Sequence, residues 1–542
     1  MSVKKIRPAA SALATGLMLA MCSAAVHAQQ AGAPASAPSG EGSGTDTRKV
    51  TINEYIVRGN SVLDARSIER AVTPYLGPGR TLEDVEAARA ALQAAYQERG
   101  YQSVYVDLPE QQVTGGVVFL QVTETRLGQV EVVGAKHNDP EALRERVPSL
   151  RAGEVPDFNR AQQELTRLNR TAKRQVIPLV KQGGQAGTMD VQLKVEDESP
   201  WRFSASVNND HSADTSALRS VVSVGNDNLW QKEHVASLTF FAAPEDLDEA
   251  KVWSGSYALP LGSPDWTLEF SGYTSDSDVL TEGNTNVTGR GHELGVKLSR
   301  TLAMSGAWWH QFSVGVAFKD RKEGVGMLDQ ETQYVPLKYA PITVGYSGFM
   351  QGEKNQLGTG LQVVFGTRNF LGYGSDADAF DWARYRADPS FVAVKADLND
   401  TLTLESGAQW YARLSAQVSD IPLVSGEQFA AGGMYTVRGY RSAEALGDYG
   451  AIGSIEWRTR PLGLWGLQDW RLYAYLDGAW LKLRDPLPEQ DDEFSLGSIG
   501  IGSNFRLYDH VNVRLDYGYP LTDGPTTTKG AHRLHFSVGT SF

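Results

Sequence analysis

From Trp201 to the end of the chain, apolar and polar residues alternate with a period of two, which is the pattern of half-buried β-strands. The segments WRFSASVNN, HVASLTFF, WTLEFSGY and WYARLSAQV show it clearly, and helical periodicity is nearly absent from this region. At about ten residues per membrane-spanning strand and a similar average connection, the length of the region predicts a closed barrel of about 16 antiparallel strands.

The last eleven residues, HRLHFSVGTSF, carry this pattern to the terminus. One face of the predicted strand carries Leu534, Phe536, Val538, Thr540 and Phe542. An apolar outward face suits a strand that meets lipid, and because a final Phe is a common outer-membrane assembly signal, Phe542 is the candidate signal. On patterning alone, the last strand of a soluble β-sandwich remains the alternative. No uninterrupted apolar run approaches the roughly 20 residues that a transmembrane helix needs.

Residues 49–198 combine strand and helix patterns. Thr81, with Asp84 three residues later, has the form of a capping box at the start of a helix, and Gly100 supplies its end. The predicted elements of the first part are a strand at Lys49–Gly59, helices at Ile68–Tyr75 and from Thr81, and strands at Tyr101–Leu108 and Gly116–Thr123. They form a β-α-α-β-β unit of about 75 residues.

The same order of elements repeats after Leu127. The predicted elements are a strand at GQVEVVG, helices at Pro140–Val147 and Asn159–Thr171, and strands at Arg174–Val180 and Met189–Val195. Two tandem copies of one α+β unit indicate an internal repeat. We therefore expect domains at 49–124 and 125–198, followed by the barrel at 199–542.

The amino-terminal segment Met1–Ala28 has a basic start, an apolar stretch and small residues before its end, which is the pattern of a secretory signal peptide. Residues 29–48 are rich in Ala, Gly, Ser and Pro and predict a flexible linker; they lack the apolar stripe of an amphipathic helix. The only cysteine, Cys22, lies in the leader, so thiol chemistry in the mature chain is not expected. The net charge of -13 argues against a nucleic-acid partner.

One motif lies between strand-like segments: AGGMYTVRGYRS, Ala431–Ser442, with three glycines around Arg438. By itself, TVRGY also fits a hairpin tip. Val437, Arg438, Gly439 and Tyr440 match in order the VRGY motif of the inward-folded loop in two-partner secretion transporters, the TpsB family, which the chain therefore resembles. The segments PEQQVTGGVVFLQVTETRLGQVEVVG, GGQAGTMDVQLKVEDESPW and VNVRLDYGYPL also resemble segments of that family.

This resemblance, to the ShlB/FhaC/HecB-like haemolysin activation/secretion proteins, implies a transmembrane β-barrel of about 16 antiparallel strands preceded by two α+β POTRA domains. It implies the outer membrane of a Gram-negative bacterium, with the POTRA domains in the periplasm. The implied function is recognition and export of an unfolded exoprotein, of haemolysin or adhesin type. The other implied partners are outer-membrane lipid and, during biogenesis, the barrel-assembly machinery.

A second family motif, FxDxG, lies on an inner barrel strand, and its acidic residue contacts the loop arginine. The corresponding string here is YLDGA, Tyr475–Ala479, in which the glycine stands one place early, at Gly478. The resemblance therefore implies that Val437–Tyr440 form a loop and gating motif with Asp477 as its barrel-wall partner. An Arg–carboxylate contact in a shielded lumen can be bidentate and strong. The alternative is that Asp477 faces lumen water.

A candidate segment for binding the exoprotein lies in the first α+β unit: Val117, Val118, Phe119, Leu120, Gln121 and Val122. An extended client can add to a free strand edge through main-chain hydrogen bonds, or lie in the groove beside a helix. Each apolar residue of this segment is equally suited to packing in the domain core.

The sequence contains neither a GxxxxGK[ST] phosphate loop nor an HExxH zinc motif, and its nine histidines are dispersed. We therefore expect no enzyme activity, no cofactor and no metal site. Two other function classes share parts of this plan. The first is a factor that inserts other barrels into the membrane; the presence of only two POTRA-like units and the TpsB motifs disfavour it. The second is a diffusion porin, which the tandem domains ahead of the barrel disfavour.

Overall fold

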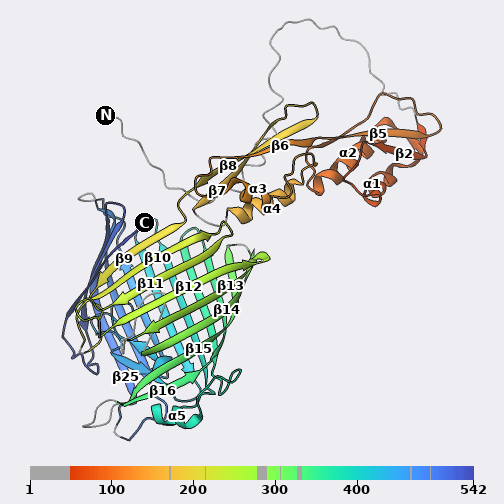
Figure 1. Cartoon of the computed structure of the whole chain (residues 1–542). Coiled ribbons are helices and arrows are strands. Elements are labelled where there is room, and N and C mark those ends of the chain that lie inside the picture. The colour runs from red at the N-terminus through yellow and green to blue at the C-terminus, as the bar shows by residue number, and fades with distance from the viewer. Residues whose placement is uncertain are drawn as a thin grey trace. The chain divides into compact units, whose positions relative to one another are not determined.

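The computed structural model describes residues 49–169, 173–213, 215–276, 290–305, 307–325, 333–463, 467–488 and 490–542 (Figure 1). The predicted signal peptide and linker, residues 1–48, lie outside the described residues. No helix in the described ranges is both long and apolar enough to cross a membrane.

The first α+β domain contains the predicted helices and strands with small shifts of their ends. Its elements are β1 (Val50–Ile52), β2 (Glu54–Arg58), α1 (Ala65–Val72), a 3-10 turn (Thr73–Tyr75), β3 (Gly77–Arg80), α2 (Leu82–Glu98), β4 (Val104–Asp107) and β5 (Val117–Glu124). The capping box is confirmed, because the Thr81 backbone N–H donates to Asp84 Oδ2 at 2.8 Å and the Asp84 backbone N–H donates to Thr81 Oγ1 at 3.4 Å. The predicted first strand is split, because the N–H groups of Asn53 and Glu54 both donate to the Gly116 carbonyl.

The strand-edge prediction for Val117–Val122 is wrong. The sheet order is β2-β5-β4, so β5 is the central strand, and its backbone groups are already paired on both sides. Val118, Leu120 and Val122 point into the core and are at most 2% exposed. Strand addition needs an unpaired edge, and within the described residues this sheet ends at β2 and β4.

The second α+β domain repeats this arrangement, which confirms the internal repeat. It contains β6 (Arg126–Val133), α3 (Pro140–Glu145), α4 (Phe158–Leu168), β7 (Arg174–Gln182) and β8 (Thr188–Asp197). The sheet order is β6-β8-β7, so the last strand again lies in the centre and runs parallel to the first. Leu127, Leu143, Leu165 and Leu193 form the core between the helices and this sheet.

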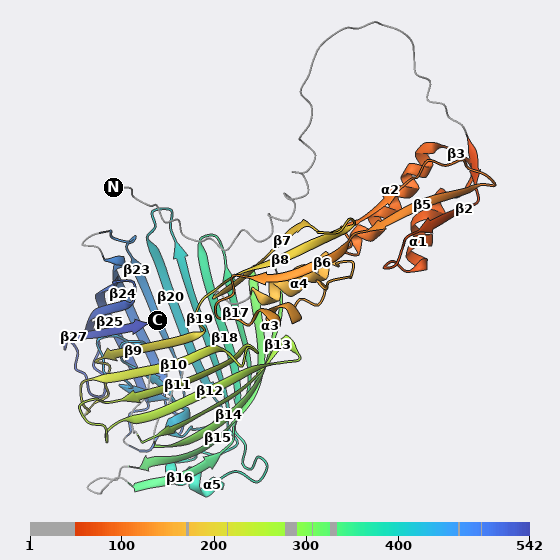
Figure 2. The same ribbon diagram turned by 45° about the horizontal axis from the view of Figure 1, so that its top comes forward.

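The region after Trp201 is a closed antiparallel barrel (Figures 1 and 2). Its strands are β9 (Trp201–Asn208), β10 (Arg219–Leu229), β11 (His234–Ala242), β12 (Lys251–Leu261), β13 (Ser263–Ser275), β14 (Arg290–Ser305), β15 (Trp308–Val325), β16 (Gln333–Tyr339), β17 (Ile342–Gln351), β18 (Asn355–Phe365), β19 (Val392–Thr403), β20 (Gln409–Ser419), β23 (Tyr449–Arg458), β24 (Gln468–Lys482), β25 (Glu493–Leu507), β26 (Val511–Pro520) and β27 (Arg533–Ser541). Both β16 and β17 pair with β15, so they are two parts of one spanning strand, broken at Pro341. Counted in this way, the described residues form the predicted barrel of 16 strands.

The barrel closes between its last and first strands. β27 pairs with β9 from Ser537 opposite Asn208 to Ser541 opposite Ser204, and the Phe542 N–H donates to the Phe203 carbonyl at 2.9 Å. The side chain of Phe542 is 67% exposed. This position places the candidate assembly signal at the seam; its role in assembly remains a prediction.

Side chains of the barrel strands alternate between an apolar outer face and a polar or packed inner face. On β24, Leu472, Leu476 and Trp480 are exposed, whereas Tyr473 and Asp477 are buried on the inner face. The same alternation places Leu534 and Val538 of β27 outward and His535 inward. An apolar outer surface around polar inner residues is the arrangement of a barrel embedded in lipid.

Candidate functional site

The longest described connection of the barrel, residues 420–448 between β20 and β23, folds into the lumen. It includes a 3-10 turn at Ser425–Glu427 and a small hairpin, β21 (Phe429–Ala431) and β22 (Ala445–Gly447). The tip of the loop reaches inner side chains of the wall, because Arg413 of β20 donates to the Thr436 carbonyl at 3.1 Å and Arg514 of β26 donates to the Met434 carbonyl at 3.5 Å. The loop therefore crosses the interior.

The motif residues Val437–Tyr440 are buried against the wall. Val437 and Tyr440 are fully buried and pack with Ile452, Ala479 and Leu481 in one apolar cluster. The Tyr440 hydroxyl lies 2.9 Å from the Gly497 carbonyl oxygen and 2.7 Å from that of Thr522. These contacts fix the loop to β24, β25 and the connection after β26.

Arg438 and Asp477 are in direct contact. The Arg438 guanidinium donates from Nε to Asp477 Oδ2 and from Nη2 to Oδ1, both at 2.7 Å, and the Arg438 backbone N–H donates to Oδ2 at 3.1 Å. Arg438 is 3% exposed and Asp477 is 2% exposed. Such a bidentate, charge-assisted pair is strong and fixes orientation, and each partner supplies the countercharge that the other needs when buried.

The structure adds two carboxylates to this pair that the sequence analysis did not assign. Arg438 Nη1 lies 2.6 Å from Glu456 Oε1 on β23 and 3.3 Å from Asp516 Oδ1 on β26. The Tyr475 ring covers the guanidinium, with its centroid 3.3 Å from Cζ. We call Arg438, Asp477, Glu456 and Asp516 the loop seat. Their spacing of up to 78 residues explains why no local motif revealed the added members.

Gly439 follows the arginine where the loop backbone passes closest to the wall. Its φ of +94° is a conformation that favours glycine, and its N–H donates to His535 Nε2 at 3.1 Å. A Cβ on the facing Gly518 would lie 2.7 Å from the Gly439 nitrogen. Two glycines therefore allow the loop and β26 to approach backbone to backbone.

The early glycine in YLDGA does not turn Asp477 away from the loop. Because side chains alternate along β24, Gly478 faces outward between Leu476 and Trp480, and Asp477 keeps its inward position. Ala479 occupies the inner position where the family motif has glycine, and it packs in the cluster that includes Val437. The departure thus exchanges a glycine for one additional methyl group beside the loop.

A second contact holds the start of the loop to other strands. Glu427, which is 4% exposed, accepts from Lys319 Nζ of β15 at 2.6 Å and from the Tyr339 hydroxyl of β16 at 2.9 Å. Gln417 of β20 donates to the Glu427 carbonyl at 3.0 Å. The sequence carried no signal for this contact because its partners lie 88 and 108 residues away.

Comparisons with known proteins agree with this geometry. A family model described as "Haemolysin secretion/activation protein ShlB/FhaC/HecB" matches residues 187–505, and one described as "POTRA domain, ShlB-type" matches residues 50–125. The chain belongs to the ShlB/FhaC/HecB family. It is an outer-membrane β-barrel transporter of the TpsB type that secretes an exoprotein; this is a transporter family, not an enzyme family.

The outer membrane transporter CdiB of Escherichia coli is 25% identical over 499 residues, which are 88% of this chain and 80% of that protein. The solved structure of CdiB from Escherichia coli matches with a TM-score of 0.61 at 20% identity and covers 94% of each chain. BamA from Haemophilus ducreyi lacking POTRA domains 1-3 matches with a TM-score of 0.53 at 13% identity, over 91% of this chain and 100% of that one. At these identities the two structures establish a shared fold alone, so the likeness to BamA does not support an assembly function.

Proposed function

We propose that this ShlB/FhaC/HecB transporter binds a large unfolded exoprotein, of haemolysin or adhesin type, with its POTRA domains and threads it through the barrel. The Arg438 loop seat holds the loop that governs the passage. The observation that carries this proposal is a buried arginine with three carboxylates, located on a loop that crosses the lumen. A diffusion porin would gain nothing from such a closed charge network.

The first POTRA domain supports client binding in a revised form. The interior position of β5 leaves β2 and β4 as edges of the described sheet, and β6 and β7 as edges of the second. An extended client can add its backbone to such an edge with little sequence requirement. Phe119 remains a candidate contact on the face away from the core, with Arg58 Cζ 4.2 Å from its ring centroid. We further propose that the barrel-assembly machinery recognises the seam strand that ends at Phe542.

The test is complementation of a deletion strain. Removal of this chain should eliminate one large protein from the medium, and the full chain should restore it. Deletion of residues 50–122, or Arg438→Ala, should leave an inserted barrel that does not restore secretion. Arg506→Gln, whose arginine pairs with Asp469 away from the seat, is the matched control and should secrete normally.

Normal secretion by the 50–122 deletion would contradict the receptor role of the first domain. Normal secretion by Arg438→Ala would contradict the role of the seat. If deletion of the chain instead depleted other outer-membrane barrels and left the proteins of the medium unchanged, the chain would be an assembly factor and not an exporter.

A further inference from the structure

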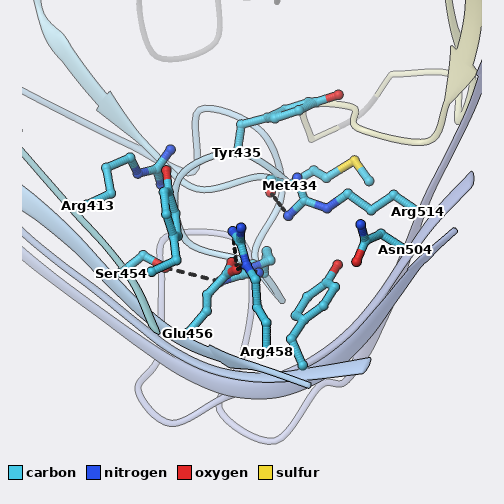
Figure 3. Close-up of a pocket in the computed structure, with 11 residues that line it drawn as sticks. Arg413, Met434, Tyr435, Ser454, Glu456, Arg458, Asn504 and Arg514 are labelled. Atoms are coloured by element: carbon cyan, nitrogen blue, oxygen red, sulfur yellow. Dashed lines mark hydrogen bonds and ion pairs between the residues drawn. The ribbon is translucent and has the colours of Figure 1, made fainter. Parts of the chain in front are cut away.

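A cavity of about 290 Å³ lies next to the loop tip, inside the barrel (Figure 3). Its lining includes four arginines, Arg413, Arg438, Arg458 and Arg514, and the rings of Tyr411 and Tyr435. Figure 3 shows Arg413 and Arg514 on opposite sides of it, with Glu456 and Arg458 between them. We call this space the arginine chamber.

The chamber adjoins the loop seat, because Arg438 and Glu456 belong to both, and part of its lining lies nearer the end of the barrel at which β9 begins. Gln409, the first residue of β20, lies opposite Arg458, the last residue of β23. The start of β26 lies beside the end of β27, which in turn pairs with the start of β9. Arg458 and Arg514 lie toward this end. Arg413 lies level with the seat, because it pairs with Ser454, which in turn pairs with Asp477. A polypeptide that enters from the POTRA-linked end therefore meets Arg458 and Arg514 before it reaches the seat.

Four arginines line the chamber, and three carboxylates pair with three of them. Arg458 Nη2 lies 2.6 Å from Glu456 Oε2, Arg514 Nε lies 2.7 Å from Asp516 Oδ2, and Arg438 is paired with Asp477. Arg413 forms no ion pair within the described ranges; its Nη2 donates to the Thr436 carbonyl, and its Nε is buried without a hydrogen-bond partner. The Arg413 guanidinium therefore lacks a carboxylate partner, and an oxyanion in the chamber would supply one.

The aromatic lining favours an ionic ligand. Arg458 Cζ is 4.3 Å from the Tyr411 ring centroid, and Arg514 Cζ is 5.7 Å from that of Tyr435, so the rings exclude water from one face of each guanidinium. Charge pairs that are partly shielded from water are stronger and less sensitive to salt than exposed pairs. The volume is sufficient for a carboxylate side chain together with several waters, each of about 30 Å³.

We propose that the arginine chamber binds carboxylate side chains of the exported polypeptide as it enters the barrel, with Arg413 as the principal contact. This inference rests on the proposed export through the barrel lumen. An incoming carboxylate beside Arg438 would offer that guanidinium an alternative to Asp477, which would couple entry of the client to release of the loop. Inorganic phosphate shares the same oxyanion chemistry and is the other source of a ligand.

The test measures binding to the purified full-length chain in detergent, with no secretion step. A fluorescent decapeptide of alternating Glu and Ser is titrated by anisotropy, beside its Gln/Ser counterpart and inorganic phosphate. We expect the Glu peptide to bind, the Gln peptide to bind at least about ten-fold more weakly, and Arg413→Gln to weaken Glu-peptide binding about ten-fold, the usual effect of losing one charge-assisted hydrogen bond. Arg506→Gln, at the same end of the barrel but outside the chamber lining, should change binding by less than about two-fold.

Equal binding of the Glu and Gln peptides, or equal binding by wild type and Arg413→Gln, overturns the proposal. Arg413-dependent binding of phosphate without binding of the Glu peptide also overturns it, because the chamber is then an ion site. If Arg413→Gln fails to fold, Arg413→Lys keeps the charge without the planar fork and should bind with intermediate affinity. Normal secretion without peptide binding rejects the chamber alone, whereas peptide binding without secretion rejects only the proposed function.

Discussion

The pair of Arg438 and Asp477 allows a quantitative test of the loop seat. Because Cys22 is the only cysteine and lies in the predicted leader, a mature Val437→Cys chain has a single thiol. Val437 is fully buried beside the seat, and cysteine is close to it in size. A thiol at this position reacts only when the loop leaves the wall, so its labelling rate reports the equilibrium between seated and released loop.

The magnitude follows from the contacts. In the Val437→Cys background, Asp477→Asn keeps the side-chain shape, but its amide oxygen can accept only one of the two bonds at 2.7 Å, as a neutral acceptor, and its NH2 group faces the other Arg438 donor. Weakening one bond costs about 0.5–1 kcal/mol and losing the other about 1.5–2 kcal/mol, so the seat loses about 2–3 kcal/mol. Since 1.4 kcal/mol is ten-fold, labelling should accelerate by about 30- to 150-fold. Glu456 and Asp516 still neutralise Arg438. The stability lost by the seat is therefore smaller than the ~3–5 kcal/mol that a buried charge without any partner costs.

Arg438→Ala should have the larger effect, because it leaves the fully buried Asp477 carboxylate without its cation. The double mutant should label no faster than Arg438→Ala alone, since both changes remove one shared interaction. Asp397→Asn, a lumen carboxylate bound to Ser415 Oγ at 2.7 Å, is the matched control and should leave labelling unchanged. Additive effects in the double mutant, or equal labelling of Asp477→Asn and Asp397→Asn, would refute a direct pair.

Three further outcomes are expected. Glu427→Gln weakens the charge-assisted bond from Lys319, so a cysteine at the buried Val424 should label about ten-fold faster, with the barrel still folded in heat-shift electrophoresis. Gly518→Ala should release the loop and block secretion, because its Cβ would lie 2.7 Å from loop backbone; Gly478→Ala, with 3.7 Å of space, should secrete normally. In the second α+β domain, burial tends to raise the pKa of Asp197, but hydrogen bonds from the Asn138 side chain and three backbone N–H groups outweigh this and lower it. The ionised carboxylate protects the backbone amides of residues 136–138 from hydrogen exchange. This protection is fully present above the ordinary Asp pKa of about 3.9 and is lost as the pH falls through the lower pKa of the folded state. In Asp197→Asn the same amides should exchange faster already at pH 7.

Much of the fold follows from local signals. The capping box at Thr81 and Asp84, the stop at Gly100 and the period-two segments after Trp201 each depend on residues close in sequence, and the structure contains the elements that they predict. Strand order does not depend on such signals. The apolar alternation of Val117–Val122 is the same for a central strand as for an edge strand, and only pairing with β2 and β4 distinguishes the two.

The same limit applies to the site. Arg438 and Asp477 were identified through motif resemblance, whereas Glu456, Asp516 and Glu427 are single acidic residues in ordinary strand or turn patterns. Their partners are brought together by closure of the barrel, at sequence separations from 18 to 108 residues. Inner-face alternation predicts that such side chains face the lumen, but not which cation each one meets.

The charged contacts of the loop seat suit a loop that alternates between a bound and a released position. The apolar cluster around Val437 and Tyr440 must expose its surface to water when the loop is released, and nothing in a polar lumen compensates that loss. A guanidinium can instead exchange one carboxylate for another, because an incoming acidic side chain satisfies the same donors that Asp477 satisfies in the seated state. On the proposed mechanism, the barrier to release of the loop is lowest when a client is present. If the proposals for the seat and the chamber both hold, the arginine excess beside Arg438 is the feature that makes this exchange selective for the exported chain.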